Sequence, residues 1–291
     1  MKKRIQYSRI IAGTMTWGSG GKQLSKNEMT ALMDYCLRQG ISTFDHADIY
    51  GGYGNEEEFG KAFSDSNIPR ENIQLISKCG IQYVCEARDN VTKHYNYSAA
   101  YIVWSVERSL KKLRTEYLDL FLMHRPSPLM QPDEISKAID RLKTDGKIKE
   151  FGVSNFTPSQ IAMIETAIPV KVNQVECSIT AEGVMYDGTL DDCITHKRTA
   201  MAWSPLGSYF REDTDRTKRI REAIVPLAEK YSATENQLIL AWLMRHPSGI
   251  HPVVGTTNED RLSEAMSATE INLELEDWFT LLTASQGHKV P

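Results

Sequence analysis

The chain has 291 residues, of which 41% are hydrophobic and 25% are charged, proportions typical of a globular protein and unlike those of disordered, collagen-like or coiled-coil chains. Its 34 basic and 38 acidic residues give a net charge of −4, and no basic block could neutralise a row of phosphates, which argues against nucleic acid as a partner. The longest apolar run, residues 238–244, is far below the roughly 20 residues that span a bilayer, so we expect no membrane segment.

Two features of the sequence predict a cytoplasmic protein. Residues 1–4 carry the positive charge of a signal peptide, but the apolar run that follows, residues 10–12, is far too short for its hydrophobic region. The five cysteines are odd in number and contain no C-x-x-C pair, which argues against a disulfide framework, a thioredoxin motif or a structural zinc site.

Helix and strand patterns alternate from near the start of the chain. Ser25 and Glu28 form a capping-box pattern, and apolar residues at helical spacing follow up to Gly40, where we expect the helix to end. Capping patterns at Thr157 and Thr234 predict two further helix starts. The strand-like runs are residues 10–12, 42–45, 73–77, 117–123, 148–153, 170–175, 199–203 and 250–254.

This alternation predicts an α/β protein built from parallel βαβ units. Eight strands without a break in composition favour one closed (β/α)8 TIM barrel, a single domain over residues 1–291, rather than an open doubly wound sheet. The longest irregular stretches, residues 80–97 and 207–217, follow the third and seventh strands, where barrel loops build active sites. Trp104 and Trp242 lie on apolar helical stripes, so we expect both in the core.

Polar or special residues recur where the expected strands end. Any one of them alone is more often a turn residue or a member of a surface ion pair. Their repetition at one end of a barrel instead indicates a catalytic rim. The residues are Gly13, Thr14, Asp45, Lys78, His124, Ser154, Asn155, Gln174, Trp203, Ser204, Gly255 and Thr256.

Four residues near these strand ends can act together in proton transfer: Asp45, Tyr50, Lys78 and His124. A tyrosine hydroxyl with a pKa of about 10 is a weak acid at neutral pH, and we expect the ammonium of Lys78 to lower that pKa. The carboxylate of Asp45 would keep Lys78 charged inside a partly dry pocket. A neutral His124 could donate a hydrogen bond to a substrate carbonyl oxygen.

At these residues the sequence resembles the aldo-keto reductase family, whose signature of Asp, Tyr, Lys and His matches the four residues in order and spacing. The short tail after Thr269 is similar to that of bacterial members, and His46 stands where many members carry a small hydroxylated residue. The resemblance covers essentially the whole chain and is carried by residues 44–51, 119–124, 151–156, 173–176 and 203–208.

The resemblance implies an NADPH-dependent oxidoreductase that reduces aldehydes or ketones by hydride transfer, with Tyr50 as the general acid. It implies that Trp203 stacks on the nicotinamide and that Arg261 binds the 2′-phosphate. The other cofactor residues implied are Ser154, Asn155 and Gln174 at the carboxamide, Ser204, Leu206 and Ser208 beside the pyrophosphate, and Gly13, Thr14, Gly255, Thr256 and Glu264 elsewhere in the site. Many members have a lysine at position 255 and an asparagine at position 265, where this chain has glycine and alanine, so NADH use stays open.

Two other functions stay open beside the reductase that acts on a small-molecule carbonyl. The family also includes channel-associated subunits that hold a nucleotide, and a lysine at the end of a barrel strand can form a Schiff base in a lyase, here Lys78. The sequence leaves the oligomeric state open. The candidate pocket aromatics, each of which could equally be ordinary packing, are Trp17, Tyr53, Tyr83, Tyr95, Tyr97 and Phe210.

Two competing motifs carry little weight. Residues 18–22 contain a G-x-G pattern but lack the third glycine and the strand-to-helix turn of a dinucleotide fingerprint, so we expect a loop. His46 with Asp45 and Asp48 could suggest a metal site, but strand alternation points neighbouring side chains apart. We therefore expect no metal.

Overall fold

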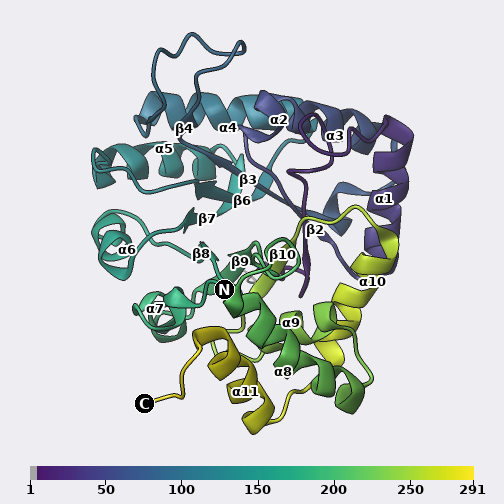
Figure 1. Cartoon of the computed structure of the whole chain (residues 1–291). Coiled ribbons are helices and arrows are strands. Elements are labelled where there is room, and N and C mark those ends of the chain that lie inside the picture. The colour runs from purple at the N-terminus through teal and green to yellow at the C-terminus, as the bar shows by residue number, and fades with distance from the viewer. Residues whose placement is uncertain (1–4) are drawn as a thin grey trace.

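The computed structural model describes residues 5–291. Within them, eight parallel strands close into a barrel in the order β1-β10-β9-β8-β7-β6-β3-β2, with helices around it (Figure 1). The predicted (β/α)8 barrel is confirmed, and each strand lies within two residues of its predicted run. The strands are β1 (Ile11–Gly13), β2 (Thr43–Asp45), β3 (Gln74–Cys79), β6 (Leu118–Met123), β7 (Ile148–Ser154), β8 (Val172–Glu176), β9 (Thr199–Trp203) and β10 (His251–Val254).

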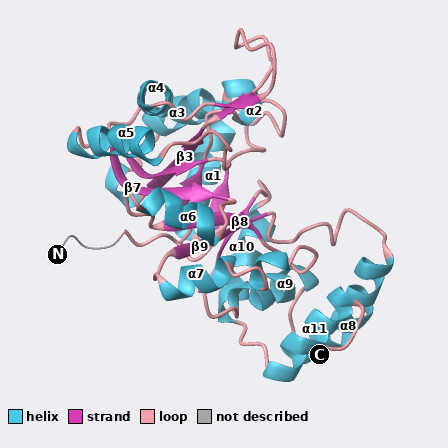
Figure 2. Ribbon diagram, turned by 90° about the vertical axis from the view of Figure 1, so that its left-hand side faces the viewer, coloured by secondary structure: helices cyan, strands magenta, loops and turns pink. Residues whose placement is uncertain are grey.

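The helices connect successive strands and cover the outside of the barrel. The predicted capping boxes at Ser25, Thr157 and Thr234 are all formed, so each side chain accepts a backbone N–H at the start of its helix. Two of the helices, α8 and α11, lie side by side at the edge of the molecule away from the strands (Figure 2). The helices are α1 (Lys26–Arg38), α2 (Tyr50–Tyr53), α3 (Asn55–Asp65), α4 (Ala99–Leu113), α5 (Pro132–Thr144), α6 (Pro158–Glu165), α7 (Thr189–Thr195), α8 (Asp215–Tyr231), α9 (Glu235–Met244), α10 (Glu259–Ser267) and α11 (Leu275–Gln286).

Two features near α4 differ from the sequence expectation. The stretch after β3 is not wholly irregular, because β4 (Ile81–Gln82) and β5 (His94–Tyr95) pair as an antiparallel hairpin whose loop projects at the top of Figure 1. Trp104 is 39% exposed rather than buried. The guanidinium groups of Arg88 and Arg108 lie 4.6 Å and 5.3 Å from its ring centroid, and these contacts replace packing in the core.

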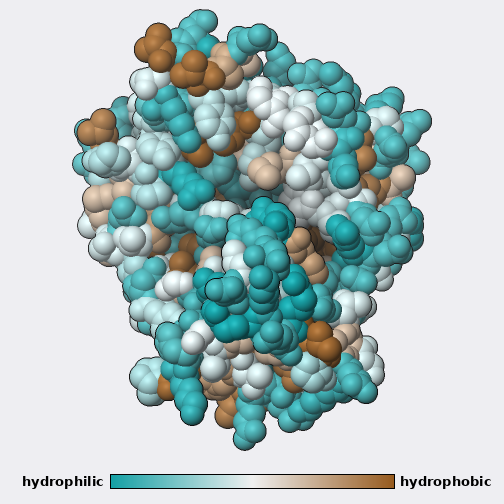
Figure 3. Space-filling view, viewed as in Figure 1, coloured by the Kyte–Doolittle hydropathy of each residue, from teal (hydrophilic) through white to brown (hydrophobic). Residues whose placement is uncertain are grey.

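The surface on the face seen in Figure 3 is mainly hydrophilic, with apolar residues in small separate groups. No helix among residues 5–291 is long and apolar enough to cross a membrane. The basic residues 1–4, on which the expectation about targeting rests in part, lie outside the described residues.

The inward-facing side chains of the strands form layers inside the barrel. Because side chains alternate between the two faces of a strand, every second residue points inward. Ile76 of β3, Val172 of β8 and Met201 of β9 belong to one buried apolar cluster in the barrel interior. The next inward position on each of these strands lies toward its carboxyl end, where barrel enzymes hold their active sites.

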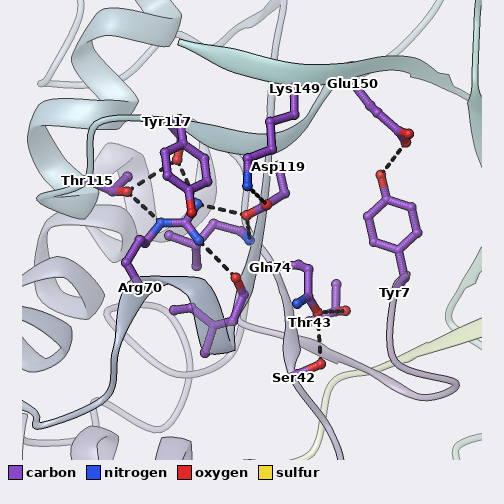
Figure 4. A network of polar contacts seen from close by, with 12 residues as sticks. Tyr7, Ser42, Thr43, Arg70, Gln74, Thr115, Tyr117, Asp119, Lys149 and Glu150 are labelled. Carbon is purple, nitrogen blue, oxygen red and sulfur yellow. Dashed lines mark hydrogen bonds and ion pairs between the residues drawn. The ribbon is translucent and has the colours of Figure 1, made fainter. Parts of the chain in front are cut away.

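A network of polar contacts lies at the opposite end of the barrel (Figure 4). Arg70 donates to Oδ2 of Asp119 at 2.8 Å and to the Tyr117 carbonyl at 2.7 Å. The same Oδ2 accepts the backbone N–H of Leu75 at 2.9 Å, and Lys149 donates to Oδ1 at 2.9 Å. The buried Asp119 therefore joins β3, β6 and β7 through both of its oxygens.

Replacing Asp119 tests whether its contacts at this end of the barrel stabilise the fold. Asp119→Ala removes hydrogen bonds from two charged groups and leaves the buried backbone N–H of Leu75 without its acceptor, so we expect it to lower the free energy of unfolding by about 3 kcal/mol in urea titrations. Asp145→Ala, which removes a partner of exposed ion pairs, should change that free energy by less than about 1 kcal/mol. Equal effects of the two variants would contradict this role.

Candidate active site

The barrel brings together all four residues of the predicted acid–base set. Lys78 follows the inward-facing Ile76 by two positions on β3, so its side chain also points inward. Asp45 ends β2, Tyr50 begins α2 in the loop that follows, and His124 comes directly after β6. All four therefore lie at the carboxyl ends of neighbouring strands.

Lys78 is the centre of the site. Its ammonium, although buried, donates to Oδ2 of Asp45 at 2.6 Å, to the His46 carbonyl at 2.8 Å and to the Tyr50 hydroxyl at 3.2 Å. Burial alone would lower the pKa of Lys78, but the charges of Asp45 and Tyr50 and their hydrogen bonds outweigh it and raise that pKa. The lysine is therefore an ammonium at neutral pH.

Both oxygens of Asp45 are occupied, which fixes its orientation. Oδ1 accepts the side-chain amide of Gln174 at 3.0 Å, opposite the Lys78 contact on Oδ2. Thr14 donates its hydroxyl to the Asp45 carbonyl at 3.0 Å and is also 2.8 Å from Nδ1 of His46. Burial, followed by the charge of Lys78, lowers the pKa of His46 to about 3, so His46 is a neutral packing residue behind β2.

The rings of Tyr50 and His124 meet edge to face across the site. Their centroids are 6.1 Å apart with an interplanar angle of 80°. Burial, followed by the charges of Lys78 and Arg125, holds the pKa of His124 well below its usual value. The imidazole is therefore neutral, as the sequence analysis expected, and its buried Nδ1 has no hydrogen-bond partner among residues 5–291.

The expected net lowering of the Tyr50 pKa is wrong. Burial is the largest influence and raises the pKa of the Tyr50 hydroxyl, while the charge of Lys78 opposes it without reversing the shift. The predicted direction of the Lys78 effect is correct, but residue spacing alone could not weigh that effect against burial. Tyr50 is therefore a protonated phenol at neutral pH, the form that can give up a proton.

The short helix that carries Tyr50 depends on a glycine. Gly51 has a φ of 57°, and a Cβ there would lie 1.8 Å from the side-chain oxygen of Asn55. The Asn55 amide group in turn donates to the carbonyls of Thr14 and Met15 at 3.2 Å and 2.9 Å. A side chain at position 51 would therefore displace the loop that positions Tyr50.

A buried acidic cluster, Asp48 and Glu56 with their hydroxyl partners, lies behind the loop that carries Tyr50. Ser105 donates to Asp48 at 3.1 Å, and Ser77 donates to Glu56 at 2.6 Å. Burial, followed by repulsion from Glu56, raises the pKa of Asp48 to about 7. The sequence analysis weighed Asp48 only as a metal ligand and missed this cluster, because its serine partners come from β3 and α4.

The residues expected at the nicotinamide lie on adjacent strand ends. Trp203 ends β9 and donates its indole N–H to the Asn155 side-chain oxygen at 2.9 Å, which fixes the tilt of the ring. Asn155 has a φ of 62°, and its amide donates to the Ser154 hydroxyl at 2.8 Å. Ser154 donates to the Gln174 carbonyl at 2.8 Å. An aromatic face thus stands beside a row of amide and hydroxyl groups.

The residues expected at the phosphates lie in the loops after β9 and β10. In the first loop Ser204 has a φ of 48°, Leu206 packs on the core, and the Ser208 backbone N–H donates to Thr180 at 2.9 Å. The second loop and α10 hold Gly255, Thr256, Arg261 and Glu264.

The two charged residues expected on α10 differ in their contacts. Glu264 accepts from Asn236 at 3.2 Å, whereas the guanidinium of Arg261 forms no ion pair with residues 5–291. Arg261 lies in the first turn of α10, and a helix N-terminus with an unpaired arginine suits a phosphate group. The residues present therefore fit a nicotinamide dinucleotide.

One residue near the site, Arg125, was missed by the sequence analysis, and it contacts Tyr97, one of the candidate pocket aromatics. Arg125, directly after His124, places its guanidinium 5.2 Å from the Trp203 ring centroid. Tyr97 is buried and holds the Arg125 backbone. The position of Arg125 one residue beyond a strand-end histidine was the signal available in the sequence.

The remaining candidates divide between packing and exposure. Trp17 and Tyr53 are buried and pack in the core clusters, whereas Tyr95 and Phe210 are exposed. The G-x-G pattern at residues 18–22 lies in a loop. Within residues 5–291, no three His, Cys, Asp or Glu side chains are grouped so that they could hold a metal ion.

A parallel barrel with tyrosine, lysine, aspartate and histidine at its carboxyl end is the architecture of a barrel oxidoreductase. Residues 9–284 match the model of the aldo/keto reductase family, and the chain belongs to this family. It is 43% identical to the oxidoreductase YcsN of Bacillus subtilis over 293 residues, which cover 99% of this chain and 97% of that protein.

Two further comparisons agree with this assignment. The 6-dehydroglucose reductase of Agrobacterium fabrum is 35% identical over 295 residues, which cover 100% of this chain and 98% of that protein. A crystal structure of a thermostable aldo-keto reductase in complex with the inhibitor epalrestat superposes with a TM-score of 0.81 at 28% identity and covers 97% of both chains. The family model thus covers residues 9–284, and the likeness in fold covers 97% of the chain.

The pKa of Asp48 gives a testable pH dependence. Because folding raises this pKa from 3.8 to about 7, protonated Asp48 contributes stability below pH 3.8 that is lost as the pH rises through about 7. We expect Asp48→Asn to remove this loss, which is at most on the order of 4 kcal/mol. In urea titrations from pH 5 to 8, the stability of the variant relative to the parent should rise with pH. Exposed Asp140→Asn should show no such trend.

Proposed function

We propose that the protein reduces the carbonyl group of small aldehydes or ketones to an alcohol with NADPH, and that Tyr50 is the proton donor. The observation that carries this proposal is the contact of the buried Lys78 ammonium with both the Tyr50 hydroxyl, at 3.2 Å, and the Asp45 carboxylate, at 2.6 Å. The name of the 6-dehydroglucose reductase supports the reducing direction and a small polar carbonyl substrate.

The reduced nicotinamide, when bound, supplies the hydride to the carbonyl carbon. Tyr50 donates its proton to the carbonyl oxygen as that oxygen gains negative charge. Lys78 then stabilises the phenolate that remains, because its ammonium already contacts the hydroxyl. Asp45 holds Lys78 charged throughout, so the ammonium does not compete as a proton source.

His124 orients the carbonyl. A neutral imidazole donates from one nitrogen only, and the buried Nδ1 faces no acceptor among the described residues. With its proton on Nε2, His124 donates to the same carbonyl oxygen that Tyr50 protonates. The centroids of the two rings are 6.1 Å apart, so the two side chains border the same part of the site.

The Schiff-base alternative is disfavoured by the charge of Lys78. A lysine must be a neutral amine to attack a carbonyl, whereas Asp45 and Tyr50 raise the pKa of Lys78 above its usual value.

The proposal also locates the reaction in the cytoplasm. All five cysteines are free thiols, the state expected in a reducing compartment.

Tyr50→Phe tests the acid directly. It removes one hydroxyl and keeps the ring, so the fold and the cofactor site should survive. Because general acid catalysis contributes about 10²–10⁴-fold, we expect carbonyl reduction to fall by at least the lower figure in an NADPH absorbance assay.

Two controls distinguish the loss of the acid from a loss of cofactor binding and from a different activity. NADPH affinity, followed by quenching of tryptophan emission, should change little in Tyr50→Phe. A nucleotide-holding subunit would show no reduction in parent or variant, and a lyase would trap substrate on Lys78 with borohydride. If the variant reduced its best substrate at the parental rate with hydride transfer rate-limiting, the acid would have to be reassigned to His124.

The preference for NADPH depends on Arg261. Its guanidinium has no ion-pair partner among residues 5–291, and a Cβ at Gly255 would meet no atom within 4 Å. The site therefore offers one cation for the 2′-phosphate and open space for a second. A charge-assisted contact of this kind is worth about 1.5–3 kcal/mol.

We expect Arg261→Ala to weaken NADPH binding by at least about tenfold while NADH binding changes little. Gly255→Lys should have the opposite effect and strengthen NADPH binding selectively. Dissociation constants for both cofactors, measured for the parent and the two variants, check both statements. A parent that binds the two cofactors equally would rule out the role of Arg261.

A further inference from the structure

Arg125 is held at a fixed place beside the proposed reaction centre. It follows His124 directly, so its Cα lies at the carboxyl end of β6. The buried Tyr97 hydroxyl donates to the Arg125 carbonyl at 2.6 Å and accepts the Arg125 N–H at 3.1 Å. This double contact fixes the backbone from which the side chain extends.

The guanidinium of Arg125 contacts an aromatic ring but has no hydrogen-bond or ion-pair partner among residues 5–291. It lies 5.2 Å from the Trp203 ring centroid and forms no hydrogen bond or ion pair with residues 5–291. Two other partly buried arginines form ion pairs: Arg70 pairs with Asp119, and Arg198 pairs with Glu165 and Asp192. Arg9 has no carboxylate partner among the described residues, but its guanidinium donates to the carbonyls of Gly249 and Met244. The guanidinium of Arg125 has neither kind of contact within the described part of the chain.

The positive charge of Arg125 acts on the proposed catalytic residues. It is among the charges that lower the pKa of His124 and that oppose the rise in the pKa of Tyr50. Lys78, the other cation nearby, is already neutralised by Asp45 at 2.6 Å. The charge of Arg125 is therefore the one left uncompensated where the carbonyl substrate would lie.

We propose that Arg125 is a specificity residue that binds a carboxylate or phosphate group on the carbonyl substrate, so that the natural substrate is an anionic aldehyde or ketone. This inference rests on the proposed function. A guanidinium matches both groups because its planar N–H fork forms two parallel hydrogen bonds to paired oxygens. The cofactor phosphates have their own candidate site at α10, around Arg261.

The test compares matched substrates in the full-length protein with NADPH. 3-Formylbenzoate and its methyl ester compare a carboxylate with a neutral group that is larger by one methyl, and glyceraldehyde 3-phosphate and glyceraldehyde compare an aldehyde with and without a phosphate group. We expect the parent to have a lower KM for the anion of at least one pair, and the pair identifies carboxylate or phosphate as the group recognised.

Arg125→Met should raise the KM for that anion by at least about tenfold more than the KM for its neutral partner, because only the anion loses a contact with the guanidinium. Any change that the lost charge causes at Tyr50 and His124 is common to both substrates, and Arg125→Lys should restore part of the difference. Arg141→Met, which removes an exposed charge on α5, serves as the control. A KM that rises equally for the neutral and anionic substrates, or a parent that prefers the neutral member of both pairs, overturns the proposal.

A binding measurement separates this inference from the proposed function. Titration of the NADPH-bound protein with isophthalate and with glycerol 3-phosphate, followed by calorimetry, needs no turnover. If no aldehyde is reduced but one anion binds the parent at least about tenfold more tightly than it binds Arg125→Met, the proposed function fails and the anion site stands. If neither anion binding nor KM depends on Arg125, the anion site fails whatever the catalytic activity.

Discussion

The ion pair between Lys78 and Asp45 is the interaction on which the rest of the site depends. Burying two charges is costly unless their geometry is good and their remaining hydrogen-bonding groups are satisfied. Here the lysine has three acceptors, and the aspartate accepts from Gln174 as well as from Lys78. Strands β2, β3 and β8 are thereby tied together by the charges that hold the Tyr50 hydroxyl.

The barrel supplies this geometry through strand periodicity. The apolar residues Ile76 and Val172 fill the interior, and the next inward residues on their strands are Lys78 and Gln174. The inward-facing residues thus change from apolar to polar between two successive layers of the barrel. This change separates the packed interior from the polar rim that holds the candidate site. At the other end, Asp119 pairs with both Arg70 and Lys149 and so links neighbouring strands.

How far the sequence predicts this structure depends on the range of the interactions. The eight strands and the capping boxes at Ser25, Thr157 and Thr234 follow from local pattern, and the four strand-end residues follow from topology and family resemblance. The exposure of Trp104, the β4–β5 hairpin and the pairing of Asp48 with Ser105 depend on segments that meet only in the folded chain. The net pKa shift of Tyr50 needs the extent of burial, which no spacing reveals.

Three cations stand at the carboxyl end of the barrel, and they differ in what neutralises them. Lys78 is paired within the protein, and its charge is used on Tyr50. Arg261 lies on α10, and Arg125 follows β6. Neither residue forms an ion pair with residues 5–291. Unpaired guanidinium groups on a rigid scaffold favour anionic ligands. The proposals that Arg261 binds the cofactor and that Arg125 binds the substrate therefore share the same electrostatic grounds but depend on separate residues.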